Sequence, residues 1–373
     1  MSQRKMLYVA CVLLVLIVLG ASPGRTPTEV AAKATQASSC GGWSIVKSPN
    51  PQNDNILTAV SAVSASDVWA VGYDIFFPNL TVIEHWDGAK WKVVPGPSIR
   101  KEESELLAVA AVSTNDVWAV GYSYPPRGAH KTLIEHWNGT KWSIVPSPSP
   151  GFFDNDLYGI AAVSANDMWA VGSYTADTSD PTLIEHWNGT NWSVVFSPNI
   201  AGGNYLTGVV AVSANDIWAV GYYSFLSGGN QTLIEHWNGT KWSLVSSPNP
   251  GVYGNGLSGV SAASTSDVWA VGNTTILHWN GIIWSMVQAN VPGNLVGVSV
   301  VSTNDVWAVG YGINGTLTEH WNGTTWKVVK SPNVKGYSSY LSAVAVVTSG
   351  DVWAVGNYNN NDILYQTLIE HYC

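Results

Sequence analysis

Charged residues are scarce in this 373-residue sequence, at 11% of the total, and positive charge is scarcer than negative. The chain has 16 Lys and Arg against 25 Asp and Glu, which gives a formal net charge of −9 at pH 7. Proteins that bind a nucleic-acid backbone usually carry a basic patch, so we expect no nucleic-acid partner. Low charge combined with 36 Gly and 18 Pro is typical of many short strands joined by tight turns.

The short motifs that carry common chemistries are also missing. The sequence has no Gly-rich phosphate loop, no Gly-x-Ser-x-Gly elbow, no His-Glu-x-x-His and no Cys-x-x-Cys. Two acidic clusters, Asp154 with Asp156 and 359–362, each lack a full set of calcium ligands, which favours solvated loops. We therefore expect no cofactor, no metal and no catalytic residue that a motif would identify.

One phrase recurs seven times and predicts the fold. Asp67-Val68-Trp69-Ala70-Val71-Gly72 reappears with small changes at intervals of 38 to 51 residues. Such a period is typical of one four-stranded blade of a β-propeller. The sequence therefore predicts an all-β, seven-bladed β-propeller with four antiparallel strands in each blade.

The second repeat shows how one blade is built. Short apolar runs predict strands over 107–112, 116–122, 132–137 and 141–145, and Asn138-Gly139 predicts a type I′ hairpin turn between the last two. The middle strands are apolar on both faces, as expected where neighbouring blades cover both sides of a sheet. All 20 Trp fall at three repeated strand positions, so we expect them to be buried between blades and none to be left for a ligand.

The two ends of the repeat region complement each other. The last repeat stops at Cys373 after three strands, and the segment 40–46 matches a fourth strand. This predicts a ring closed by the N-terminal strand joining the last blade. The same alignment places Cys40 opposite Cys373 and predicts a disulfide, which requires an oxidising compartment; two free thiols are the alternative.

Residues 1–39 show no repeat. Arg4 and Lys5 precede an apolar run from Met6 to Ala21, so 1–21 is interpreted as a signal peptide or, alternatively, an uncleaved membrane anchor. The Ser/Thr/Ala/Pro-rich segment 22–39 predicts a flexible stalk, followed by the propeller over 40–373. We expect a secreted or membrane-anchored extracytoplasmic protein that meets the membrane only through an uncleaved N-terminal segment.

A Glu-His pair ends the third strand of six repeats, and Leu277-His278 replaces it in the fifth. Such pairs could indicate acid–base or metal chemistry. However, neighbouring strand residues point to opposite faces, and copies spread around a ring lie far apart. The repeated Asp begins the second strand and the His ends the third, so the two approach each other at the same end of one blade. We interpret each pair as a buried structural hydrogen bond that satisfies polar groups between blades, by analogy with the Asp–His–Trp network of WD-repeat propellers. The expected pairs are Asp67 with His85, Asp116 with His136, Asp167 with His186, Asp216 with His236, Asp267 with His278, Asp305 with His320 and Asp351 with His371.

Two connections in each blade vary widely, and we expect them on one face of the ring, opposite the two regular turns. Variable loops on a rigid scaffold usually carry function. Their aromatic residues suit recognition of a glycan or a protein, although some should simply cover their own loops. This candidate ligand face comprises Phe76, Phe77, Tyr124, Phe152, Phe153, Tyr174, Tyr223, Phe225, Tyr253, Tyr337, Tyr340 and Tyr358.

Over residues 40–373 the repeats resemble those of bacterial secreted propellers built from Trp-rich Asp-Val-Trp-Ala-Val-Gly blades. They are more distantly similar to sialidase-like Asp-box propellers, tectonin-type lectins and the photosystem-assembly propeller. The segment 87–91 lacks the leading Ser of an Asp-box and the Thr before its Trp. Arg100 and Arg127 are the only arginines after residue 40, which excludes the arginine triad of a sialidase.

Taken together, these features predict a monomeric binding module, secreted or surface-tethered, that recognises a glycan or a protein. A glycosidase or polysaccharide lyase is one alternative, with a carboxylate pair drawn from Asp154, Asp156, Asp177, Asp180 and Asp362. A cell-envelope assembly scaffold is the other. The prediction leans against an enzyme.

Overall fold

The computed structural model describes residues 41–51, 54–75, 80–97, 102–125, 128–200, 202–225, 228–251, 254–289, 293–359 and 364–373. The chain divides into two units, Met1–Ser39 and Cys40–Cys373, and all described residues belong to the second. The expected signal peptide or anchor and the stalk lie outside the described residues, as do Cys40, Phe76, Phe77, Tyr253, Asp362 and the side chain of Phe225. Nowhere in the described ranges is there a helix long and apolar enough to span a membrane.

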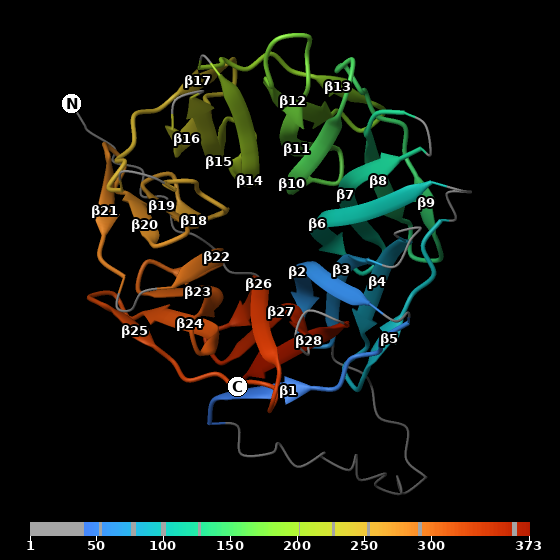
Figure 1. Cartoon of the computed structure of the whole chain (residues 1–373), viewed down its shortest axis with the longest axis vertical. Helices are drawn as coiled ribbons and strands as arrows, with labels where there is room; N and C mark the ends of the chain where they lie inside the picture. The colour runs from blue at the N-terminus through green and yellow to red at the C-terminus, as the bar shows by residue number, and fades with distance from the viewer. Residues whose placement is uncertain are drawn as a thin grey trace, which may run out of the picture. The chain divides into compact units, whose positions relative to one another are not determined.

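Within the described residues, 28 strands form seven four-stranded antiparallel sheets, which confirms the predicted propeller (Figure 1). Blade 1 comprises β2 (Asn55–Ser64), β3 (Asp67–Asp74), β4 (Leu80–Trp86) and β5 (Trp91–Val93). Blade 2 comprises β6 (Glu103–Ser113), β7 (Asp116–Tyr124), β8 (Lys131–Trp137) and β9 (Trp142–Ile144). Blade 3 comprises β10 (Asn155–Ser164), β11 (Asp167–Tyr174), β12 (Thr182–Trp187) and β13 (Trp192–Val194). Blade 4 comprises β14 (Gly203–Ser213), β15 (Asp216–Phe225), β16 (Gly228–Trp237) and β17 (Trp242–Leu244).

The remaining blades follow the same order. Blade 5 comprises β18 (Gly259–Ser264), β19 (Asp267–Gly272), β20 (Thr275–Trp279) and β21 (Trp284–Val287). Blade 6 comprises β22 (Asn294–Ser302), β23 (Asp305–Gly312), β24 (Gly315–Trp321) and β25 (Trp326–Val328). Blade 7 comprises β26 (Ser338–Thr348), β27 (Asp351–Asn359), β28 (Tyr365–Tyr372) and β1 (Trp43–Val46).

The ring is closed as the sequence predicts. Strand β1 is the outermost strand of blade 7 and pairs antiparallel with β28, with Trp43 opposite Tyr372 and Val46 opposite Ile369. Figure 1 shows β1, in blue, beside the red C-terminal strands. The first and last strands of the ring therefore belong to one sheet, and the ring cannot open without breaking that pairing.

The innermost strands are longer than the apolar pattern predicts, and the outermost strands are shorter. In blade 2 the inner strand begins at Glu103 rather than Leu107, because β6 continues past a register shift between Leu106 and Ala108 and keeps pairing with β7. Polar residues at its start could not be distinguished from a loop by their hydropathy. Because these polar residues pair with β7, the β6–β7 pairing extends to the edge of the variable face.

The glycine that ends the repeated phrase is required by this register shift. A Cβ on Gly121 would lie 1.9 Å from the carbonyl oxygen of Glu105, and one on Gly72 would lie 1.9 Å from that of Ile56. The equivalent distances in the other blades are 1.8 to 2.1 Å. Real Cβ atoms do not approach a backbone oxygen so closely, so only glycine fits here.

Hydrophobic clusters lie between neighbouring blades. One cluster joins Trp69 and Ile83 of blade 1 to Leu106 and Trp142 of blade 2. The Trp of the second and fourth strands are buried throughout, and aromatic pairs such as Trp69–Trp142, with ring centroids 5.6 Å apart, link the blades. The prediction that all 20 Trp are buried was wrong for the six that end the third strands. These are half-buried, because each donates its indole N–H to a backbone carbonyl of the exposed turn between the first two strands, as Trp86 does to Ala65.

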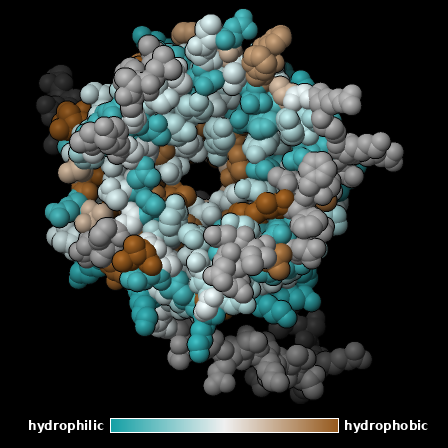
Figure 2. Space-filling view, viewed as in Figure 1, coloured by the Kyte–Doolittle hydropathy of each residue, from teal (hydrophilic) through white to brown (hydrophobic). Residues whose placement is uncertain are grey.

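A narrow channel of about 280 Å³ runs along the axis, lined by residues of all seven innermost strands. Small residues line much of it, including Gly159, Gly208, Gly259 and Gly297. A Cβ on Gly297 would lie 3.0 Å from the Cα of Ala343, which explains the preference for small residues where the strands converge. Figure 2 shows the ring hollowed at this axis, with hydrophobic residues around the opening.

Candidate functional site

The two faces of the ring differ in how regular their loops are. On the regular face, Asn138 Oδ1 accepts hydrogen bonds from the backbone N–H groups of Thr140 and Lys141 at 3.0 and 3.1 Å. Trp137 pairs with Trp142, and only Gly139 of the intervening residues has a positive φ. The expected type I′ turn was therefore wrong, since that turn needs positive φ at both central residues. The loop instead has four residues, closed by the Asn side chain.

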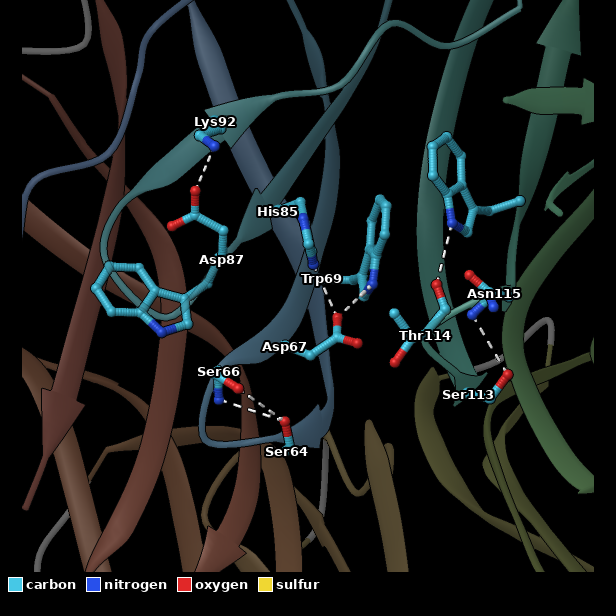
Figure 3. A network of polar contacts seen from close by, with 12 residues as sticks. Ser64, Ser66, Asp67, Trp69, His85, Asp87, Lys92, Ser113, Thr114 and Asn115 are labelled. Carbon is cyan, nitrogen blue, oxygen red and sulfur yellow. Dashed lines mark hydrogen bonds and ion pairs between the residues drawn. The ribbon is translucent and has the colours of Figure 1, made fainter. Parts of the chain in front are cut away.

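All seven expected Asp–His contacts are present near this face, with His Nε2 2.7–2.8 Å from Asp Oδ1. Figure 3 shows Asp67 between His85 and Trp69, whose indole N–H also donates to the carboxylate at 3.0 Å. Each His ring also lies against the Trp of its own blade, at 4.2 Å between centroids for His85 and Trp69. The pairing of each Asp with its His is therefore confirmed.

The Asp and the His of a pair lie on neighbouring strands of one blade, as the sequence predicts. The prediction that the pairs are buried was wrong for the histidines. They are partly exposed, because each lies near the end of the third strand beside the regular-face turns. Their side chains are 22–29% exposed, and this correction applies to His85, His136, His186, His236, His278, His320 and His371.

The Glu beside each of six of these His lies on the opposite side of the sheet, in the seam with the preceding blade. These carboxyl groups have no solvent exposure; they belong to Glu84, Glu135, Glu185, Glu235, Glu319 and Glu370. Burial raises the pKa to about 8 for five of them, namely Glu84, Glu135, Glu185, Glu235 and Glu370. The strand pattern predicted only that each Glu and its neighbouring His point to opposite faces of the sheet. A Ser-Pro step follows most fourth strands and could have indicated a partner for the buried Glu. At the closing seam, Ser48 Oγ donates to Glu84 at 3.0 Å.

The variable face carries a groove of about 640 Å³ where blades 2 and 3 meet. Three of the predicted aromatic residues line it: Tyr124 at the end of β7, and Phe152 and Phe153 on the segment that enters blade 3. Phe152 is 77% exposed and Phe153 is 50% exposed, and their rings meet edge to face at 5.0 Å. The two adjacent rings form a small exposed apolar patch at the edge of the groove.

The segment that presents these phenylalanines is fixed by a buried side chain. Asn155 is 1% exposed. Its Oδ1 accepts from the Gly151 N–H at 2.6 Å, and its Nδ2 donates to the carbonyls of Phe153 at 2.7 Å and His130 at 3.1 Å. The backbone under the two rings is therefore held in place from within, so binding would order little additional chain.

The floor of the groove is polar. His130 is the one His outside the repeats; its Nδ1 lies 2.8 Å from Asp156 Oδ1, and its backbone N–H donates to Asp154 Oδ1 at 3.1 Å. Its ring stacks on Tyr122 at 4.4 Å and meets Tyr124 edge-on. The hydrogen bond to Asp156 raises the pKa of His130, against a smaller lowering by burial. His130 was not among the predicted site residues, although its position outside the repeat was a visible signal in the sequence.

None of the other predicted aromatic residues whose side chains the structure describes lines this groove. Tyr174 and Tyr223 pack against the hydrophobic clusters at either side of blade 3, so they cover their own loops. Tyr337 and Tyr358 meet edge to face at 5.4 Å in blade 7. Tyr340 lies 5.2 Å from Tyr311 near the channel mouth.

The described carboxylates considered for catalysis lie on two segments: Asp154 and Asp156 where the chain enters β10, and Asp177 and Asp180 between β11 and β12. Asp156 has both oxygens engaged, Oδ1 with His130 and Oδ2 with the Tyr158 hydroxyl at 3.1 Å. Asp180 accepts from the hydroxyl of Tyr205, in β14 of blade 4, at 2.8 Å, and Asp177 is exposed. No group of three or more His, Cys, Asp and Glu among the described residues could hold a metal ion.

Comparison with known proteins identifies the fold. No family model matches the chain, and no curated protein matches its sequence. Three similar solved structures are YCF48 bound to a D1 peptide, the WD40 β-propeller domain of Doa1 and an ancestral GH74 enzyme. YCF48 is 14% identical, with a TM-score of 0.59 over 89% of this chain and 97% of that one. The Doa1 domain is 13% identical, with a TM-score of 0.56 over 88% of this chain and 95% of that one. The GH74 enzyme is 14% identical, with a TM-score of 0.55 over 85% of this chain and 46% of that one. Identities this low establish a β-propeller and nothing finer.

Proposed function

We propose that the propeller is a non-enzymatic interaction module that binds a segment of a partner protein in the groove between blades 2 and 3. The observation that carries this is the pair Phe152 and Phe153, exposed to solvent on a backbone that Asn155 fixes from below. Large aromatic side chains dominate the binding energy of protein interfaces. YCF48, which shares the fold, has been solved with a bound peptide, and this supports the choice of partner.

The proposal is tested by selecting peptides from a random 12-residue phage library against the full propeller and measuring their affinity. Phe152→Ser together with Phe153→Ser should weaken binding by about 2 kcal/mol or more, roughly thirtyfold, as loss of a hot-spot pair does. The matched control is Ile282→Ser with Ile283→Ser, two residues 79% and 58% exposed on the regular face. The proposal fails if no peptide is selected, or if both double variants bind the selected peptides as the unmodified protein does.

The same proposal places the module outside the cytoplasm, secreted or tethered to a cell surface. Its support is the basic and apolar pattern of residues 4–21 and the cysteine pair expected at the ring closure. Cell fractionation combined with N-terminal sequencing of the mature protein tests this. A cytosolic protein that retains Met1 would contradict it.

A further inference from the structure

A second cavity opens beside the mouth of the central channel, where blades 6, 7 and 1 meet. It has a volume of about 500 Å³, and we call it the blade 7 cavity. Tyr311 of β23, Tyr340 of β26, Asn357 of β27, Tyr365 of β28 and Ile56 of β2 line it. It shares no lining residue with the groove of Phe152 and Phe153. Its volume lies within the range of small-molecule sites, roughly 300–1,000 Å³.

The cavity is open because no aromatic ring lies opposite Tyr340 in blade 7. In blade 4, Tyr205 lies directly opposite Tyr222 across the strands, and the rings stack at 4.9 Å with 23° between their planes. In blade 7, the residue opposite Tyr340 is Asn357, which has no ring to cover it. Tyr340 instead meets Tyr311 of the neighbouring blade edge to face, at 5.2 Å and 73°. The equivalent cross-strand position is therefore filled by a stacked ring in blade 4 and left open in blade 7.

The backbone of Tyr365 is held by a hydrogen bond to the buried Asp54. Its backbone N–H donates to Oδ1 of Asp54 at 2.6 Å, and Asp54 is 8% exposed. This contact joins the third strand of blade 7 to the segment entering blade 1. One wall of the cavity is therefore formed before any ligand arrives, which lowers the cost of ordering the site on binding.

The lining is uncharged but not apolar throughout. None of the described lining residues is Asp, Glu, Lys, Arg or His, so the cavity offers no partner to a charged ligand. Ile56 and Leu341 supply apolar surface, while Asn357 and Ser342 can both donate and accept hydrogen bonds. A hydrocarbon ligand would leave those polar groups unsatisfied. A pyranose ring presents an apolar C–H face and a rim of hydroxyl groups, which matches this alternation of tyrosine rings with amide and hydroxyl groups.

We propose that the blade 7 cavity is a binding site for an uncharged saccharide, with a sugar ring against Tyr340 and Tyr311 and its hydroxyl groups toward Asn357 and Ser342. This site is independent of the peptide groove. The propeller would then hold a protein segment and a neutral glycan at separate places on the variable face.

The test is an array of neutral oligosaccharides built from glucose, mannose, galactose and N-acetylglucosamine, with sialylated and sulfated glycans as charged comparators. The full protein should bind one or more neutral glycans, and saturation-transfer difference NMR should place the sugar C–H protons against tyrosine. Tyr340→Ala should weaken that binding at least tenfold, while thermal unfolding reports whether the variant is folded. Tyr311→Phe, which keeps the ring and removes one hydroxyl, should weaken it severalfold and serves if Tyr340→Ala does not fold.

The outcomes separate this site from the groove. The double variant Phe152→Ser/Phe153→Ser should bind the same glycan unchanged. The inference is overturned if no neutral glycan binds at millimolar concentration, if only charged glycans bind, or if Tyr340→Ala and Tyr311→Phe both bind normally. It is also overturned if the phenylalanine double variant alone loses the glycan. Peptide selection reports on the groove in every one of these cases.

Discussion

The hydroxyl of Ser48 donates a hydrogen bond to Oε2 of Glu84 over 3.0 Å, and this contact joins the last blade to the first. Ser48 follows β1, the closing strand of blade 7, and also lies 2.5 Å from the Thr367 hydroxyl on β28. Glu84 lies in β4 of blade 1 with no solvent exposure. The seam where the ring closes therefore contains a buried carboxyl held by a hydroxyl, and the Thr–Ser half of this arrangement recurs after blades 2, 3, 4 and 6.

These buried carboxyls should make the propeller less stable as the pH rises from about 4.5 to about 8. Below pH 4.5, the ordinary pKa of Glu, the carboxyls are protonated in the folded and the unfolded chain. Above it the unfolded chain loses protons that the folded chain keeps until its own pKa, about 8 for Glu185, so the free energy of unfolding falls across this window. Glu185→Gln, which cannot ionise, should reduce the slope. Urea unfolding at pH 5, 6.5 and 8.5 measures it, with exposed Asp177→Asn as the control. Equal stability of the unmodified protein at pH 5 and pH 8.5 would contradict the account.

Replacing Gly96 by Ser should stabilise the protein. Gly96 stands where Ser48 and Ser147 stand in other seams, and a Cβ there would lie 3.5 Å from Glu135 Oε2 and 3.1 Å from Thr81 Oγ1. The new hydroxyl should bond to Glu135, whose oxygens have no hydrogen-bond partner among the described residues, and contribute about 1 kcal/mol. Denaturant unfolding provides the measurement. Gly96→Ala is the control, because an equal gain from Ala would trace the effect to the unfolded chain rather than to the hydroxyl.

Replacing Gly121 by Ala should be severely destabilising. The new Cβ would meet the Glu105 carbonyl oxygen at 1.9 Å, and both atoms belong to paired backbone that cannot move apart without losing the ladder. We expect a loss of about 3 kcal/mol or more in unfolding free energy, or failure to fold. Gly350→Ala, where nothing lies within 4 Å of the added Cβ, should change stability little. A soluble Gly121→Ala protein with an unchanged denaturation midpoint would refute the role assigned to this glycine.

The Cys40–Cys373 disulfide stays a prediction, since Cys40 lies outside the described residues. The neighbouring backbone is consistent with it, because the Gly42 N–H donates to the Cys373 carbonyl at 3.3 Å. Peptide mapping of the secreted, non-reduced protein should recover the linked peptides, and Cys40→Ser should lower the free energy of unfolding by about 2–4 kcal/mol. Recovery of both cysteines alkylated without prior reduction would show that the bond does not form.

The sequence predicted what repeats and missed what depends on contacts between repeats. The Asp of the phrase and the His of the third strand are fixed within one blade, so their spacing was enough to pair them but not to tell how exposed the His would be. The burial of Glu135 depends on blade 1, and the groove depends on two loops brought together by the ring. The exposure of Phe152 and the partial burial of Tyr174 follow from local conformations that composition does not specify. His130 was the exception, because a His outside an otherwise regular pattern could have been singled out from the sequence.

The most direct test of the account is amide hydrogen exchange of the full propeller with and without a selected peptide. The account predicts slower exchange in 128–131 and 150–155, which carry the groove around Phe152 and His130, and no change in the regular-face turns such as 138–141. Protection confined to the regular-face turns or to the outermost strands, with unchanged exchange at 150–155, would contradict the claim that the variable face is where this propeller binds its partner.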